Sequence, residues 1–366
     1  MVKKDKVRLG DVCTIVSGTT PKTVTKEYWD GELNWITPAE LSDDIDIIYK
    51  TERKITNKAV TDSSLKLLPV GTVLLSSRAP IGKVAIVGSP MYCNQGFKNL
   101  ICSNSIFNKF LYWFLKGKKD FLNSLGRGAT FKEISKSIVA DIQIPLPPLS
   151  EQKRIAAILD KATELIVLRK QQIQKLDLLV KSRFIEMFGN TQTNPKDLSL
   201  MPWCDVFLTT TGKLDSNAMV KNGQYPFFTC AKECFRIDTY AFDCEALLLA
   251  GNNAAGIYDV KYYKGKFNAY QRTYVLRLIN KQWSYKLFKI QLEDKLLYLQ
   301  NQSKGSNTRY LTLGILNKLQ FIVPPISEQN TFEAFVTQVD KSKSTLQQSL
   351  EKLELNYKAL MQTYFG

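Results

Sequence analysis

A repeat with a spacing of 177 residues constrains the fold of this 366-residue chain more than any other feature. The segment Pro147-Pro148-Leu149-Ser150-Glu151-Gln152 returns as Pro324-Pro325-Ile326-Ser327-Glu328-Gln329, and each copy runs on without a gap to end in Phe-Gly. A unit of this length lies far outside the period of about 20–50 residues found in solenoid proteins. The sequence therefore predicts a tandem duplication of one module, in which a domain is followed by a helix.

The two tracts that follow these motifs have the periodicity of long amphipathic helices. Their apolar residues recur in steps of three and four, the ~3.5-residue period of a coiled-coil seam. We expect Ser150 and Ser327 to be N-caps behind the Pro-Pro pairs, and Gly189 to end the first helix. At ~1.5 Å per residue each helix would be roughly 55 Å long. Neither could bury its apolar stripe alone, so we expect an antiparallel coiled coil about an internal pseudo-twofold axis.

The expected organisation is head, helix, head, helix, where a head is the domain before each helix. The heads are residues 1–149 and 190–326, and the helices are residues 150–189 and 327–366. Each head combines β-rich runs with one aromatic helix, which predicts an α+β fold made of two tandem α/β domains. The expected strands are 70–76, 84–87, 246–250 and 274–279, and the expected helices are 105–116 and 283–299. Gly82 matches Gly256, and Asn94 matches Asn268, at an offset of 174, whereas the loops diverge.

The positive charge is concentrated in the heads. Residues 1–150 carry 21 Lys and Arg against 14 Asp and Glu, and residues 190–326 carry 17 against 10. The two helical tracts carry 8 against 5 and 4 against 5. This distribution favours heads that bind a polyanion such as nucleic acid.

Several catalytic classes lack their sequence signals. The chain has no histidine, no Gly-Lys followed by Ser or Thr, and no glycine-rich nucleotide-binding turn. The triplets Glu52-Arg53-Lys54 and Glu293-Asp294-Lys295 do not coincide under the repeat, so they argue only weakly for a nuclease. The seven cysteines are irregularly placed, and we interpret them as free thiols in a reducing cytoplasm. No apolar run approaches the ~20 residues of a membrane span, and no metal site is expected.

Short motifs in both heads resemble the DNA specificity subunit of type I restriction–modification enzymes. In the first head they include Leu9-Gly10-Asp11-Val12, Ser17-Gly18-Thr19-Thr20-Pro21 and Ser77-Arg78-Ala79-Pro80-Ile81-Gly82, together with the Pro-Pro border. The second head is similar to another variety of the same domain through Gly223-Gln224-Tyr225-Pro226-Phe227-Phe228 and the segment 267–274. It departs from the pattern at its start, where Trp203-Cys204-Asp205-Val206 replaces the Leu-Gly-Asp opening and leaves the first strand undefined.

The resemblance implies a non-catalytic, cytoplasmic prokaryotic subunit. Each head would recognise one half of a bipartite, asymmetric double-stranded DNA target, and the helices would set the gap. Two methyltransferase subunits would dock on the helices, and motor–nuclease subunits would complete an adenine methyltransferase and ATP-dependent endonuclease. No cofactor is implied in this chain, whereas S-adenosylmethionine, ATP and magnesium are implied in the partners.

Polar, glycine-rich loops supply the candidate DNA contacts. Arg can pair bidentately with guanine and Asn or Gln with adenine, while Lys, Ser and Thr mostly contact phosphate. The turns at 126–130 and 305–309 rank highest because they occupy matching positions in the repeat. The candidates are Ser17, Thr19, Thr20, Lys22, Ser77, Arg78, Lys83, Asn94, Gln95, Arg127, Thr130, Lys132, Lys213, Asn252, Asn253, Gln271, Arg272, Lys304, Ser306, Asn307, Thr308 and Arg309.

Two other classes remain open at the level of sequence. One is a stand-alone DNA nuclease or methyltransferase, against which the missing catalytic motifs argue. The other is a scaffold that bridges proteins and uses its basic heads for RNA or acidic partners.

Overall fold

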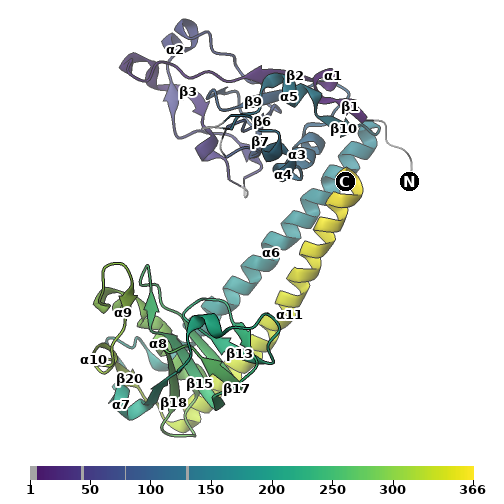
Figure 1. The fold of residues 1–366 in the computed structure, drawn as a ribbon. Coiled ribbons are helices and arrows are strands. Elements are labelled where there is room, and N and C mark those ends of the chain that lie inside the picture. The colour runs from purple at the N-terminus through teal and green to yellow at the C-terminus, as the bar shows by residue number, and fades with distance from the viewer. Residues whose placement is uncertain (1–5, 43–44, 79, 129–131) are drawn as a thin grey trace. The chain divides into compact units, whose positions relative to one another are not determined.

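The computed structural model describes residues 6–42, 45–78, 80–128 and 132–366, which divide into two compact units (Figure 1). Unit 1 comprises residues 1–169 and 349–366, and unit 2 comprises residues 170–348. Each unit therefore contains one head together with parts of both long helices. This division differs from the four consecutive segments expected from the sequence.

In the part that the structure describes, unit 1 contains three small sheets, and the aromatic helix α3 packs on strands β6 and β7 of the largest one. In its described residues the sheet orders are β2-β9-β6-β7-β4, β5-β3-β8 and β1-β10. The strands are β1 (Lys6–Arg8), β2 (Cys13–Ser17), β3 (Trp29–Ile36), β4 (Ile47–Ile48), β5 (Lys54–Ile55), β6 (Val73–Leu75), β7 (Val84–Val87), β8 (Tyr92–Cys93), β9 (Lys98–Cys102) and β10 (Gln143–Pro145). The short helices are α1 (Leu9–Val12), η1 (Lys26–Tyr28), η2 (Pro38–Glu40), α2 (Asn57–Asp62), α3 (Asn108–Lys116), α4 (Lys119–Ser124) and α5 (Lys136–Asp141).

Unit 2 has one large sheet of order β12-β18-β15-β17-β13-β14 and the pairs β11-β20 and β16-β19. The strands are β11 (Leu200–Pro202), β12 (Phe207–Thr211), β13 (Tyr225–Phe228), β14 (Phe235–Ile237), β15 (Phe242–Ala250), β16 (Asn252–Asn253), β17 (Val260–Ala269), β18 (Thr273–Leu278), β19 (Arg309–Tyr310) and β20 (Gln320–Ile322). The short helices are α7 (Trp203–Val206), η3 (Ser216–Ala218), α8 (Tyr285–Asp294), α9 (Leu296–Gln302) and α10 (Leu313–Leu316). The four expected strands are confirmed as β6, β7, β15 and β18, and the structure pairs β6 with β7 and β15 with β18.

The two heads repeat one order of elements, but not at one offset. Lys6 of β1 matches Leu200 of β11, a shift of 194, whereas Leu149 matches Ile326, a shift of 177. The first head is therefore 17 residues longer between these landmarks. The unusual opening of the second head forms α7, the counterpart of α1, so its first strand pair β11-β20 matches β1-β10.

The match of Asn94 with Asn268 is wrong. The backbone nitrogen of Asn94 donates to the carbonyl of Ile36 at 2.9 Å, and in unit 2 that position is taken by Tyr270, which donates to Phe228 at 2.9 Å. Asn268 lies two residues earlier and is buried within β17. The loops of the two heads differ in length, so no single offset aligns them.

The long helices are α6 (Leu149–Phe188) and α11 (Ile326–Phe365), which begin and end one residue before the predicted limits. Because each begins at Leu149 or Ile326, Ser150 and Ser327 lie inside the first turn, so the predicted N-cap role is wrong. Proline suits the position just before a helix because its missing N–H would have no partner there. Gly189 adopts φ +78°, as expected of a C-terminal glycine.

Within each unit the two long helices are antiparallel. In unit 2, Asp177 pairs with Lys343 at 2.5 Å, and Phe184 meets Phe332 with ring centroids 5.8 Å apart. In unit 1, Ile155 and Phe365 share one buried core, and Trp113 of α3 contacts both Asp160 of α6 and Tyr357 of α11. Residue numbers that rise along α6 therefore meet numbers that fall along α11 in both units. The predicted antiparallel pairing is confirmed in each unit.

The repeated motif has a structural explanation in its glutamine. The Gln152 side chain is fully buried, accepts from the backbone nitrogen of Phe107 at 2.8 Å, and donates to the carbonyls of Ser105 and Pro147. Gln329 does the same in unit 2, where it accepts from Ser284 and donates to Pro324. Each glutamine thus fixes the start of a long helix to the segment that leads into the aromatic helix of its head. Within the described ranges, no helix combines the length and apolarity needed to cross a membrane.

Candidate nucleic-acid interface

Four predicted segments of unit 2 converge on one surface. The backbone nitrogen of Gly251 donates to the carbonyl of Arg272 at 2.8 Å, and that of Gln271 donates to Leu214 at 2.9 Å. Strand β16 pairs with β19, which places Asn252 opposite Tyr310 and Asn253 opposite Arg309. The sheet ends therefore bring together the segments 213–214, 251–253, 271–272 and 304–310.

The side chains on this surface differ in how free they are. Asn253 is engaged locally, because its Oδ1 accepts from the backbone of Ala255 at 2.9 Å. Arg309 donates from Nη1 to the carbonyl of Gln300 at 3.3 Å and stays exposed. Asn252 is half-buried. The other predicted residues are exposed, namely Lys213, Gln271, Arg272, Lys304, Ser306, Asn307 and Thr308.

Unit 1 brings its predicted loops together in the same way. The Asn94 amide donates to Thr20 Oγ1 at 3.0 Å, which joins the loop after β2 to the loop before β9. The backbone nitrogen of Ser77 donates to Gly96 at 2.7 Å. Arg78 and Arg127 each form a β-bridge to Glu133. Ser17, Thr19, Gln95 and Lys132 are exposed beside these contacts.

Two predicted residues of unit 1, Ser77 and Lys83, are placed less favourably for contact with DNA, whereas Lys22 is exposed. Ser77 is fully buried, and its Oγ accepts from Lys98 Nζ at 3.3 Å. Lys83 Nζ donates to the carbonyl of Leu41 at 2.6 Å, which indicates a structural role. The backbone carbonyl of Lys22 accepts from Trp29 Nε1. Thr130 lies outside the described residues.

Both units build the candidate surface on one hydrogen-bond frame. Ser77 and Gly251 hold equivalent places, because the carbonyl of each accepts from a backbone nitrogen further along the chain, that of Ile134 at 2.9 Å and that of Leu311 at 2.8 Å. Reciprocal backbone bonds join Arg127 to Glu133 in unit 1 and Lys304 to Tyr310 in unit 2. Across this shared frame the side chains differ in charge and shape, with Arg78, Arg127 and Glu133 replaced by Asn252, Lys304 and Tyr310.

A matched pair of glycines allows the backbone to pass closely at the base of each surface. A Cβ on Gly18 would lie 1.9 Å from the carbonyl oxygen of Asn94, and one on Gly212 would lie 1.8 Å from that of Ala269. No side chain larger than hydrogen fits without moving the strand end. Close packing of the backbone therefore explains these two glycines of the predicted loops.

Sequence reasoning missed Glu133 and Tyr310. They match each other at the offset of 177; Tyr310 directly follows the turn 305–309, and Glu133 lies three residues after the turn 126–130. That matched position was the signal that could have identified them.

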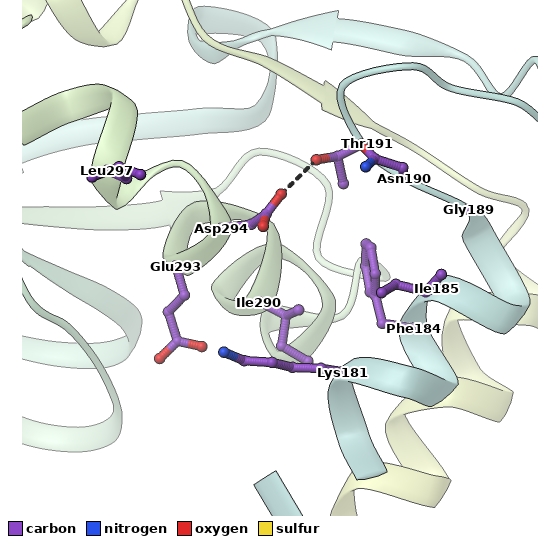
Figure 2. A pocket seen from close by; sticks show the side chains of 10 residues that line it. All are labelled: Lys181, Phe184, Ile185, Gly189, Asn190, Thr191, Ile290, Glu293, Asp294 and Leu297. Atoms are coloured by element: carbon purple, nitrogen blue, oxygen red, sulfur yellow. Dashed lines mark hydrogen bonds between the residues drawn. The ribbon is translucent and has the colours of Figure 1, made fainter. Parts of the chain in front are cut away.

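The candidate surface is separate from the cavity shown in Figure 2. This cavity of 260 Å³ lies in unit 2 between the end of α6 and helices α8 and α9, and no predicted site residue lines it. Thr191 Oγ1 donates to Asp294 Oδ2 at 2.9 Å across its rim. Among the described residues, no three metal-ligating side chains gather where they could bind an ion. The arrangement offers polar and basic loops on open strand ends, which suits an extended polyanion.

Comparison with known proteins identifies the family. The chain belongs to the family described as the type I restriction modification DNA specificity domain, which it matches over residues 1–178 and 195–355. This result confirms the resemblance found in the sequence.

Two named relatives agree with this membership. The chain is 39% identical over 190 residues to the type I restriction enzyme MjaIX specificity subunit of Methanocaldococcus jannaschii, covering 51% of this chain and 43% of the relative. It is 38% identical over 160 residues to the EcoDI specificity subunit of Escherichia coli, covering 42% of this chain and 34% of the relative. These matches therefore span less than half of either relative.

The fold likeness extends over the whole chain. The S subunit of a type I restriction–modification system from M. genitalium superposes with a TM-score of 0.65, covering 99% of this chain and 96% of that chain at 15% identity. The predicted α+β fold with two tandem domains and long helices is confirmed.

Proposed function

We propose that this protein is the sequence-recognition component of a type I restriction–modification assembly, and that each head recognises one half of a bipartite DNA target. The observation that carries this proposal is the shared hydrogen-bond frame with different side chains. A common frame would place each surface against duplex DNA in a similar way, while Arg78 and Asn252 at one position would select different bases.

Charge supports DNA as the partner of both heads. The excess of basic residues in the head segments favours phosphate binding, which is independent of sequence and weakens with salt. The exposed loops would add base contacts in the groove. DNA-binding proteins typically use basic charge for phosphate binding and loop side chains for base recognition.

We propose that methyltransferase subunits dock on the long helices and that motor–nuclease subunits complete the assembly. Helix α6 has exposed apolar side chains in both units. They are Leu165 and Leu168 in unit 1, and Leu178 and Ile185 in unit 2. Apolar side chains exposed along a helix favour a protein partner. S-adenosylmethionine, ATP and magnesium would then act in the partners.

Activity should appear only in the assembly. The full chain alone is expected to transfer no methyl group to DNA, whereas with its methyltransferase subunit it should direct methylation to one bipartite motif. Labelled S-adenosylmethionine and sequencing of modified bases measure both properties. Methyl transfer by the chain alone, or unselective methylation by the complex, would contradict the proposal.

The length of the long helices should set the gap in the target. Four residues inserted after Ile173 in α6, and four after Lys343 in α11, keep the Asp177–Lys343 pair and lengthen the helices by about 6 Å. The complex should then methylate a motif with the same half-sites and a different gap. As a control, α6 residues 174–176 are replaced without a change of length and with Asp177 retained, which should leave the gap unchanged. An unaltered gap after the double insertion would show that the helices do not determine it.

A further inference from the structure

In unit 1 the side chain of Arg78 is held by a carboxylate. Its Nε donates to Glu133 Oε2 at 2.8 Å, and the β-bridge between the two residues aligns their backbones. The arginine side chain remains 44% exposed. Within the described part of the chain no further hydrogen bond to the guanidinium is seen, which leaves the donors of its two terminal nitrogens available.

Glu133 is held in turn by a buried lysine. Its Oε1 accepts from Lys98 Nζ at 2.9 Å, and the Lys98 side chain is only 8% exposed. Burial alone would raise the pKa of Glu133, but the hydrogen bonds and charges of Lys98 and Arg78 outweigh it and lower that pKa. The carboxylate therefore stays ionised at neutral pH and uses one oxygen for each cation.

We propose that Arg78 recognises a guanine in the half-site bound by unit 1, and that Glu133 is the residue that positions it. This inference rests on the proposed function. An arginine whose terminal nitrogens are free and parallel can donate to guanine O6 and N7 together. Because Glu133 already holds the side chain, less conformational entropy is lost when the guanine binds.

The same contact argues against a phosphate role for Arg78. Arg78 and Lys98 share the Glu133 carboxylate, so the three groups keep one net positive charge, but the carboxylate 2.8 Å from the guanidinium would repel a phosphate placed beside it. Base recognition depends on the direction of the donors and tolerates this neighbouring carboxylate. In unit 2 the equivalent places hold Asn252 and Tyr310, which cannot form such an ion pair, so the arrangement belongs to one half-site.

Selection from a random-sequence duplex library by the full chain with its methyltransferase subunit tests the inference. Arg78→Ala should reduce the preference for guanine at one position of one half-site by about 10- to 100-fold and leave the other positions unchanged. Arg78→Lys keeps the charge but not the paired donors, so it should lose the same preference. An even loss at all positions, or unaltered selection, would overturn the assignment.

Two possible roles of Glu133 predict opposite effects of its substitution on DNA binding. If Glu133 positions Arg78, Glu133→Gln should reduce the guanine preference by about 3- to 10-fold, and it should have no further effect when Arg78 is already alanine. If the carboxylate merely repels DNA, its removal should strengthen binding to every sequence and leave the preference intact, which would overturn the inference. Glu151→Gln is the matched control, because Glu151 pairs with Arg154 on α6 at 2.7 Å, away from the candidate surface.

The wild-type selection separates this inference from the proposed function. A wild-type complex without any sequence preference would contradict the proposed function. A selective wild-type complex whose preference survives Arg78→Ala would contradict only the assignment of Arg78.

Discussion

Replacement of residues 190–322 by the corresponding segment of a related specificity protein is expected to change one half of the DNA target completely and to leave the other half unchanged. The replaced segment contains the whole candidate surface of unit 2 and none of that of unit 1. The modified motif, determined by sequencing methylated DNA from the assembled complex, measures the outcome. A change in both halves would show that the heads do not act separately.

The design of this exchange must respect the core of unit 2. Contacts of the buried core cross the boundary between head and helix. The rings of Phe188 in α6 and Phe332 in α11 lie 5.5 Å apart and belong to the same buried cluster as Trp203 and Phe288 of the head. A second chimera that also carries residues 181–189 and 323–339 is the matched control for misfolding. If only the larger exchange gives folded protein, packing rather than recognition limits the smaller one.

Substitution of either motif glutamine by leucine is expected to cause the largest loss of stability. Gln152→Leu leaves the N–H of Phe107 and the carbonyls of Ser105 and Pro147 buried without their partner. Such groups cost about 1–3 kcal/mol each, so the loss of all three should lower the free energy of unfolding of unit 1 by about 3 kcal/mol or more. Gln329→Leu should act in the same way on unit 2. Chemical denaturation followed by tryptophan fluorescence measures the change.

The chain supplies matched controls for these substitutions. Gln171 and Gln348 lie on the same helices, match each other in the repeat, and are exposed. Their replacement by leucine should change stability by less than about 0.5 kcal/mol. Equal losses at the buried and exposed glutamines would mean that a general effect of leucine, and not the hydrogen bonds, determines the result.

The long helices could be predicted closely because their signal is local. Periodicity, Pro-Pro and a C-terminal glycine gave limits within one residue of those of α6 and α11. The N-cap serines were wrong because a buried glutamine, whose partners are distant in sequence, fixes each helix start instead.

The candidate surface could be predicted only as a set of loops. Exposed Arg309 and Gln271 were chosen for residue type, and the structure brings their segments together. Ser77 was chosen on the same grounds, yet it is buried under Lys98. Glu133 was omitted because an acidic residue is not expected to contact DNA, and its role follows only from its contacts. Contacts between segments that are distant in the sequence determine which of these residues are exposed. Residue type alone does not reveal such contacts.

The order in which the two cores can form during synthesis follows from the division of the helices. Phe365 is 5% exposed and packs on Phe110, with ring centroids 5.2 Å apart, in the core of unit 1. Every residue of unit 2 lies between the two segments of unit 1 in the sequence. On the ribosome, unit 2 can therefore close its core first, although it is made second. The core of unit 1 is complete only once residues 349–366 emerge, and until then the face of α3 that packs on Phe365 is apolar surface open to chaperones.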